Sequence, residues 1–184
     1  KTQLILQISL NVLKNGGQVL FQDTTNGFRP ERLVEIMGKQ EINSALLEKI
    51  KVGLITNTTQ QIQYLSKISI KNFSLIVIDN ITDLFSFEYS KKEHALEKHI
   101  FFMKYMHNLS NIAINTKIPI IVTNTVGKIN DFETENLEKS ISMFTHVKIR
   151  LSKNNNERIC QVISPFENKK FSYIIASSGL QSTS

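Results

Sequence analysis

The strongest restriction on the fold of this chain comes from a continuous, mostly apolar run, Phe73-Ser-Leu-Ile-Val-Ile78, which ends in Asp79. A strand covered by helices on both faces reads as a continuous hydrophobic run, whereas a strand with one wet face alternates with polar residues. The segment Ile118-Pro-Ile-Ile-Val-Thr123 repeats the pattern. These two runs predict buried strands of a mostly parallel sheet.

Helical segments alternate with strands along most of the chain. The apolar pattern predicts helices over residues 3–14, 30–37 and 58–69, a helix of about 25 residues that includes 96–113, and strands over 18–22 and 51–56. Asn15-Gly-Gly17 would end the first helix, and Thr58-Thr59 would cap the third. Residues 145–151, 157–163 and 171–175 predict closing antiparallel strands, with a turn at Asn154-Asn-Asn156.

This order of elements predicts an α/β fold with a mostly parallel central sheet flanked by helices and antiparallel strands at its C-terminal edge. The 184 residues contain no internal repeat and no linker, so a single domain over residues 1–184 is expected. The net charge of +6 permits contact with nucleic acid. No apolar run approaches the ~18 residues of a membrane span, and no signal-peptide pattern is present, so no membrane partner is expected.

Cys160 is the single cysteine, which excludes an intrachain disulfide framework and fits a reducing compartment. We interpret it as a buried core residue rather than a reactive thiol. The four histidines show no metal-ligand spacing with cysteine or carboxylate partners. Basic residues gather on the last predicted strands, where a solvated hairpin face is the favoured interpretation: Lys148, Arg150, Lys153, Arg158, Lys169 and Lys170.

Two short motifs indicate a phosphate site. Lys1-Thr2-Gln3 opens an apolar helix in the manner of the end of the loop G-x-x-x-x-G-K-[ST], whose glycines would precede Lys1. In that loop the lysine reaches the β- and γ-phosphates and the hydroxyl binds Mg²⁺. Asp79 follows the most hydrophobic strand, where P-loop enzymes place the carboxylate that holds Mg²⁺; an ordinary capping aspartate is the alternative. Since open α/β sheets bind ligands at the carboxyl ends of their strands, we expect Lys1, Thr2 and Asp79 to converge there.

A third motif is the strand, polar turn and helix of Val19-Leu-Phe-Gln-Asp-Thr24 followed by Phe28-Arg-Pro-Glu-Arg-Leu33. Together with Lys1-Thr-Gln-Leu4, Leu75-Ile-Val-Ile-Asp79, Val122-Thr-Asn124, Ile163-Ser-Pro165 and Ser178-Gly-Leu180, it resembles the RecA/RadA recombinase family. The match runs in order over nearly the whole chain. Within the family, the chain resembles the ATPase core of the RadA and RadB proteins and of the eukaryotic recombinase paralogs.

This resemblance implies a RecA-like P-loop NTPase fold that binds ATP and Mg²⁺. It implies that Lys1, Thr2 and Gln3 contact the nucleotide, that Thr2 and Asp79 hold the metal, and that Arg32 lies against the adenine. A guanidinium plane stacks well on a base. The alternative for Arg32 is a surface ion pair with Glu35 or Glu31.

Three departures from the family pattern bear on activity. The glutamate that orients the attacking water is replaced by Thr25, and the glutamine that senses the γ-phosphate by Thr125, whose shorter side chain lacks that reach. Loss of a positioned general base removes about 10²–10⁴-fold in rate. The DNA-binding loop region, residues 127–142, is short and holds Asp131, Glu133, Glu135 and Glu138 against Lys128 and Lys139. Such a loop is unfavourable for gripping phosphates, and residues 133–142 are expected to form a short helix instead.

The sequence therefore predicts an accessory protein of homologous recombination and DNA repair that binds ATP and hydrolyses it weakly or not at all. The expected partner is a main recombinase of the RadA type, with single-stranded DNA as a weaker expectation. The compartment would be the cytoplasm in an archaeon or the nucleus in a eukaryote. Two alternatives remain open: a non-catalytic interaction module of RecA fold, and a KaiC-like signalling ATPase.

Overall fold

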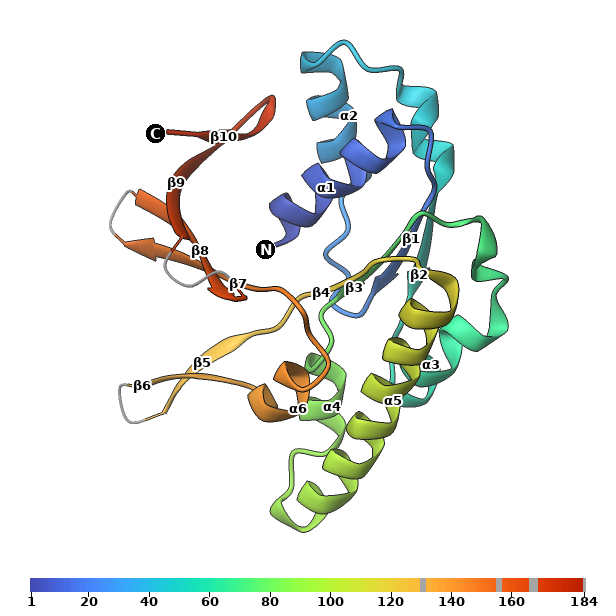
Figure 1. Cartoon of the computed structure of the whole chain (residues 1–184), viewed down its shortest axis with the longest axis vertical. Helices are drawn as coiled ribbons and strands as arrows, with labels where there is room; N and C mark the ends of the chain where they lie inside the picture. Colours follow the sequence, from blue (N-terminus) through green and yellow to red (C-terminus); the bar gives the residue numbers. More distant parts are fainter. Residues whose placement is uncertain (130–131, 155–156, 166–168, 184) are drawn as a thin grey trace.

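The computed structural model describes residues 1–129, 132–154, 157–165 and 169–183. Its centre is a four-stranded parallel sheet in the order β2-β1-β3-β4, as Figure 1 shows. The strands are β1 (Val19–Asp23), β2 (Ile50–Leu54), β3 (Leu75–Asp79) and β4 (Ile120–Val122). All five residues of β3 are buried, as its apolar run predicts, and so are all five residues of β1, including the polar Gln22 and Asp23. β4 is only half-buried because it is an edge strand, so the prediction of a buried strand at 118–123 holds for Ile118 and Thr123 and is wrong for Ile120–Val122.

Helices cover both faces of this sheet. On one face α1 (Thr2–Lys14) and α2 (Pro30–Lys39) pack against the side chains of Val19 and Phe21 from β1 and of Leu75 and Val77 from β3. The alternate residues of the same strands point to the other face. There Leu20 and Ile76 meet α3 (Thr58–Tyr64), α4 (Asp83–Glu88) and α5 (Ala95–Thr116).

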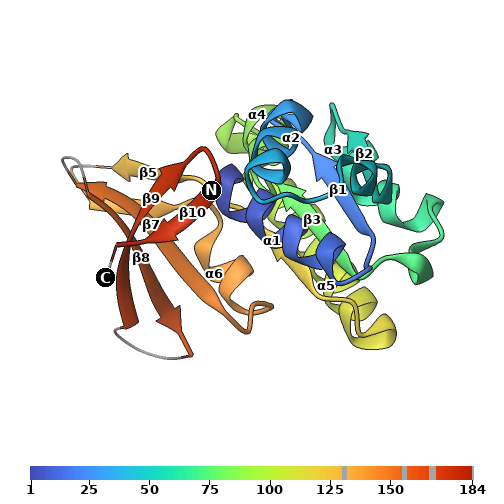
Figure 2. The same cartoon turned by 90° about the horizontal axis from the view of Figure 1, so that it is seen from above.

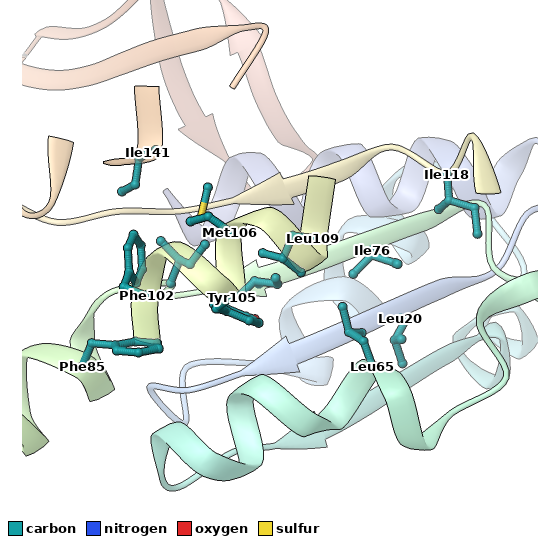
Figure 3. Packing of buried hydrophobic residues seen from close by; sticks show 12 residues of the cluster. Leu20, Leu65, Ile76, Phe85, Phe102, Tyr105, Met106, Leu109, Ile118 and Ile141 are labelled. Carbon is teal, nitrogen blue, oxygen red and sulfur yellow. The ribbon is translucent and has the colours of Figure 1, made fainter. Parts of the chain in front are cut away.

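The core under α5 is rich in aromatic residues, as Figure 3 shows. Phe85 of α4 meets Phe102 of α5 edge to face, with ring centroids 5.1 Å apart, and Tyr105 lies 6.1 Å from Phe85. Edge-to-face and offset contacts of this kind add to the hydrophobic contribution of the rings. They fix α4, and with it the turn that follows Asp79, against the sheet.

Four antiparallel strands form a second sheet in the order β10-β9-β8-β7, which Figure 2 shows to one side of the molecule. They are β7 (Lys148–Asn154), β8 (Glu157–Ser164), β9 (Lys169–Ala176) and β10 (Gly179–Ser182). The prediction of antiparallel strands at the C-terminal end is confirmed. In the described residues, however, these strands form a sheet of their own, and β10 packs against α1.

The polar stretch between the two sheets forms a hairpin and a short helix. Strand β5 (Val126–Ile129) pairs with β6 (Phe132–Glu135), and α6 (Glu138–Ser142) follows. A helix over 133–142 is therefore wrong in its first half, because residues 133–135 pair with β5 instead. Asp131 lies outside the described residues, as do two of the three residues in the predicted turn at 154–156.

Helix ends differ from the predictions in two places. α3 ends at Tyr64 and continues as short 3₁₀ turns, η2 (Leu65–Lys67) and η3 (Ile70–Asn72), rather than running to residue 69. Its cap is Asn57, whose side chain accepts a hydrogen bond from the Gln60 N–H at 2.8 Å, and not Thr58 or Thr59. Two further 3₁₀ segments are η1 (Ser44–Lys49) and η4 (Lys92–His94).

In the part of the chain that the structure describes, no helix is both long and apolar enough to cross a membrane.

Candidate nucleotide site

The candidate site lies where β1, β3 and β4 end and α1 begins. Register pairs Asp23 with Asp79, so the last residues of β1 and β3 stand side by side. The carboxyl edge of a parallel sheet is where α/β proteins bind ligands, because the connections to the helices leave a crevice there. The start of α1 brings Lys1, Thr2 and Gln3 to the same edge.

The side chains of Thr2 and Asp79 meet as the sequence predicted. Thr2 Oγ1 donates a hydrogen bond to Asp79 Oδ2 at 3.0 Å. Thr123, just after β4, donates its hydroxyl to the other oxygen, Asp79 Oδ1. Asp79 is 5% exposed and Thr123 7% exposed, so the carboxylate is a nearly buried charge held by two hydroxyl groups.

Lys1 reaches the end of β4, the neighbour of β3 in the sheet. Its Nζ donates to the Asn124 carbonyl oxygen at 2.9 Å and to Thr125 Oγ1 at 3.4 Å. The side chain is solvent-exposed, so its ammonium group is available to an anion that enters from solvent. The ammonium group of Lys1 and the carboxylate of Asp79 therefore converge on one edge of the sheet.

Polar residues just past the strand ends hold this edge together. Asn80 donates from Nδ2 to Thr125 Oγ1 at 2.7 Å and accepts at Oδ1 from the Thr82 N–H at 2.8 Å. Thr24 accepts from the Asn80 N–H at 2.7 Å, which ties the end of β1 to the end of β3. Sequence reasoning assigned no role to Thr24, Asn80 or Thr123. Their one sequence signal is that each lies within two residues of a predicted strand end.

The turn after β1 folds around the carboxylate of Asp23, which is 2% exposed. It accepts the backbone N–H groups of Thr25 at 3.0 Å, Gly27 at 3.1 Å and Phe28 at 2.9 Å. The hydroxyl of Thr25 also points back to this carboxylate at 3.3 Å. Position 25 thus presents no carboxylate to the site, as the sequence implied.

Thr125 lies closer to the site than its short side chain suggested. Its hydroxyl accepts from Asn80 Nδ2, lies 3.4 Å from Lys1 Nζ and donates to Asp83 Oδ1 at 3.3 Å. Position 125 therefore contacts the predicted phosphate lysine directly. No pattern in the sequence predicted that Asp83 reaches this edge.

Arg32 of α2 joins three elements. Its Nε donates to Gln3 Oε1 at 3.0 Å, and its guanidinium forms an ion pair with Glu35 and donates to the Ala176 carbonyl oxygen at the end of β9. The ion pair with Glu35, weighed as an alternative from the sequence, is thus present. The placement of Arg32 against an adenine, and of Gln3 in a nucleotide contact, stays a prediction.

Other ionisable groups take structural roles. Within the described residues no group of three or more histidine, cysteine, aspartate or glutamate side chains could hold a metal ion. Cys160 is buried, and burial raises the pKa of its thiol, which leaves it mostly uncharged and unreactive near neutral pH. Lys148 is not a free cation on a hairpin face, because it pairs with Glu135 at 3.0 Å and Glu138 at 3.1 Å.

Comparison with known proteins is consistent with this geometry. The Rad51 family model matches residues 2–183, nearly the whole chain. The chain belongs to the Rad51 family. The DNA repair and recombination protein RadB of Thermococcus onnurineus is 34% identical over 130 residues, 68% of this chain and 55% of that protein. RadB of Methanocaldococcus jannaschii is 28% identical over 167 residues, 86% of this chain and 76% of that protein.

The eukaryotic members of the Rad51 family share a shorter segment. The DNA repair protein RAD51 of Mycosarcoma maydis is 25% identical over 125 residues, which is 65% of this chain and 37% of that protein. The chain thus spans a little over a third of the length of that relative. Membership of the Rad51 family confirms the resemblance to the RecA/RadA recombinases that the motifs indicated, and the parallel sheet with flanking helices confirms the predicted fold class.

Proposed function

We propose that this chain is the ATPase core of a RadB-like accessory protein of homologous recombination and DNA repair, which binds ATP with Mg²⁺ and turns it over slowly. The observation that carries the proposal is the hydrogen bond between Thr2 and Asp79 beside the ammonium group of Lys1. A hydroxyl, a nearly buried carboxylate and a cation at one sheet edge are the groups that a P-loop site uses for metal and phosphate.

The residues present fit a magnesium ion. Mg²⁺ prefers hard oxygen ligands and keeps several waters, so it needs only one or two protein oxygens together with phosphate oxygens. The Thr2 hydroxyl and the Asp79 carboxylate would supply these protein oxygens, directly or through water. When bound, the ion neutralises charge that develops on the β- and γ-phosphates. Lys1 would orient the same phosphates through its ammonium group.

Slow turnover is supported by the two threonines. Thr25 is turned toward Asp23 and a hydroxyl is too weak a base to take a proton from water near neutral pH. Thr125 offers a hydroxyl where the resemblance implies a longer amide side chain. ATP would then act mainly as a ligand that stabilises a docking-competent form, because a ligand that binds only the folded state stabilises it by mass action.

The names of the relatives support a role in recombination, and the family match favours this branch over the KaiC-like alternative. A RadA-type recombinase is the partner we propose. Single-stranded DNA has weaker support, because Lys148 is neutralised by Glu135 and Glu138 next to the hairpin β5–β6. Assignment to the cytoplasm or the nucleus stays a prediction.

The test is binding of a fluorescent ATP analogue to the full-length gene product, with Mg²⁺ and with EDTA. The proposal predicts micromolar affinity that requires Mg²⁺ and falls at least tenfold in Asp79→Asn. Thr25 stands in place of the water-orienting glutamate and is turned toward Asp23. This substitution favours one competing function, a non-catalytic interaction module that has lost nucleotide binding. Absence of binding under both conditions would support that module instead.

A further inference from the structure

Asp83, on the first turn of α4, brings an additional carboxylate to the proposed ATP site. Its Oδ1 accepts a hydrogen bond from Thr125 Oγ1 at 3.3 Å, and the same hydroxyl oxygen lies 3.4 Å from Lys1 Nζ. Because Lys1 is the residue that would hold the β- and γ-phosphates, a carboxylate one hydroxyl group away from it would lie on the side of the site where the γ-phosphate binds.

The other carboxylates at this edge are already engaged. Asp23 accepts three backbone N–H groups, and Asp79 accepts the hydroxyls of Thr2 and Thr123. Glu88, at the far end of α4, accepts the Thr58 N–H at 2.8 Å and also the Thr58 hydroxyl, which ties α4 to the start of α3. In the residues that the structure describes, Asp83 Oδ2 has no hydrogen bond or ion pair. It is the carboxylate oxygen here that remains able to accept a proton from water.

We infer that Asp83 orients and deprotonates the attacking water in the slow hydrolysis of ATP, in the role that Thr25 cannot fill. This inference rests on the proposed function. A general base must reach its proton directly or through one water. Asp83 is half-buried and Lys1 is exposed, so both side chains are open to solvent. Asn80 and Thr125 hold the carboxylate in place, since Asn80 Nδ2 donates to Thr125 at 2.7 Å and Thr125 donates to Asp83.

The step balances without a further reactant. The water oxygen forms a bond to the γ-phosphorus, and the bond from that phosphorus to the bridging oxygen of the β-phosphate breaks. The electron pair of the broken bond stays on the oxygen of ADP. One proton of the water passes to the Asp83 carboxylate and then to solvent, which leaves ADP and phosphate.

The experiment compares Asp83→Asn with the wild-type full-length gene product. An asparagine oxygen can still accept the hydrogen bond from Thr125, so the variant removes basicity while it keeps the contact. Single-turnover release of phosphate should fall about 10²-fold. The Kd for the fluorescent ATP analogue and the Tm should stay within about threefold and about 2 °C of wild type. Glu93→Gln, which changes an exposed carboxylate outside the site, is the matched control and should leave phosphate release, the Kd and the Tm unchanged.

Asp83→Glu keeps a carboxylate at this position and should retain more turnover than Asp83→Asn. Three results would overturn the inference. The first is turnover in Asp83→Asn within twofold of wild type. The second is a wild type that binds ATP and releases no phosphate. Neither of these two results would contradict the proposed binding of ATP. A wild type that fails to bind ATP would overturn the proposed function and the inference together.

Discussion

Replacing Thr123 by valine tests whether Asp79 is held as a buried charge. Valine has nearly the shape of threonine and lacks the hydroxyl that donates to Asp79 Oδ1. Both side chains are under 10% exposed, so water cannot readily replace the lost donor. A hydrogen bond to a charged group contributes roughly 1.5–3 kcal/mol. For a chain of this size the Tm should therefore fall by about 3–12 °C.

The assay is thermal and urea unfolding followed by circular dichroism without nucleotide. The matched control is Thr56→Val, because the Thr56 hydroxyl forms an exposed hydrogen bond with Gln60 at 3.1 Å. This control should change the free energy of unfolding by less than about 0.5 kcal/mol. If Thr123→Val costs no more than the control, the Thr123 hydroxyl does not stabilise the Asp79 carboxylate as a buried charge.

Two further predictions concern packing and charge. Gly53→Ala should destabilise the protein by roughly 1–3 kcal/mol, because the new Cβ would lie 2.0 Å from the Tyr64 hydroxyl oxygen. In a double-mutant cycle, Tyr64→Ala should relieve most of that cost. Purely additive effects of the two substitutions would contradict the predicted clash. Lys148→Met should cost roughly 1–3 kcal/mol near neutral pH. Burial lowers the Lys148 pKa, but Glu135 and Glu138 outweigh it and raise the pKa above the ordinary 10.5. The difference in free energy of unfolding between Lys148→Met and wild type, measured with urea, should therefore disappear as pH rises above that value. A difference that grows there would contradict the ion pairing of Lys148 with Glu135 and Glu138.

Much of the fold could be predicted because its strands carry strong local signals. The buried runs that end at Asp23 and Asp79 place both strands to within two residues, and Pro30 marks the start of α2. The hairpin β5–β6 was missed because Lys128, Glu133 and Glu135 interrupt its apolar residues, so no continuous hydrophobic run marks either strand and only the pairing across the turn defines them. The cap of α3 was misplaced because asparagine and threonine compete for the same role.

In the site, too, the contacts that follow from local motifs could be predicted and those that depend on tertiary packing could not. Thr2 and Asp79 could be paired from motifs, because each follows a recognisable element and parallel strands end at one edge. Asp83 and Thr123 could not, since their contacts join residues about forty positions apart through the arrangement of α4 and β4. The contacts of Arg32 with β9 likewise depend on how the second sheet packs, which no local pattern encodes.

The proposed function requires that Thr2 and Asp79 form a magnesium-dependent nucleotide site. Isothermal titration of the full-length gene product with a non-hydrolysable ATP analogue measures this dependence. We expect micromolar binding with Mg²⁺, at least tenfold weaker binding in EDTA, and the same weak binding in Asp79→Asn whether or not Mg²⁺ is present. Equal affinity with and without the metal, or an Asp79→Asn variant that still responds to Mg²⁺ like wild type, would contradict it.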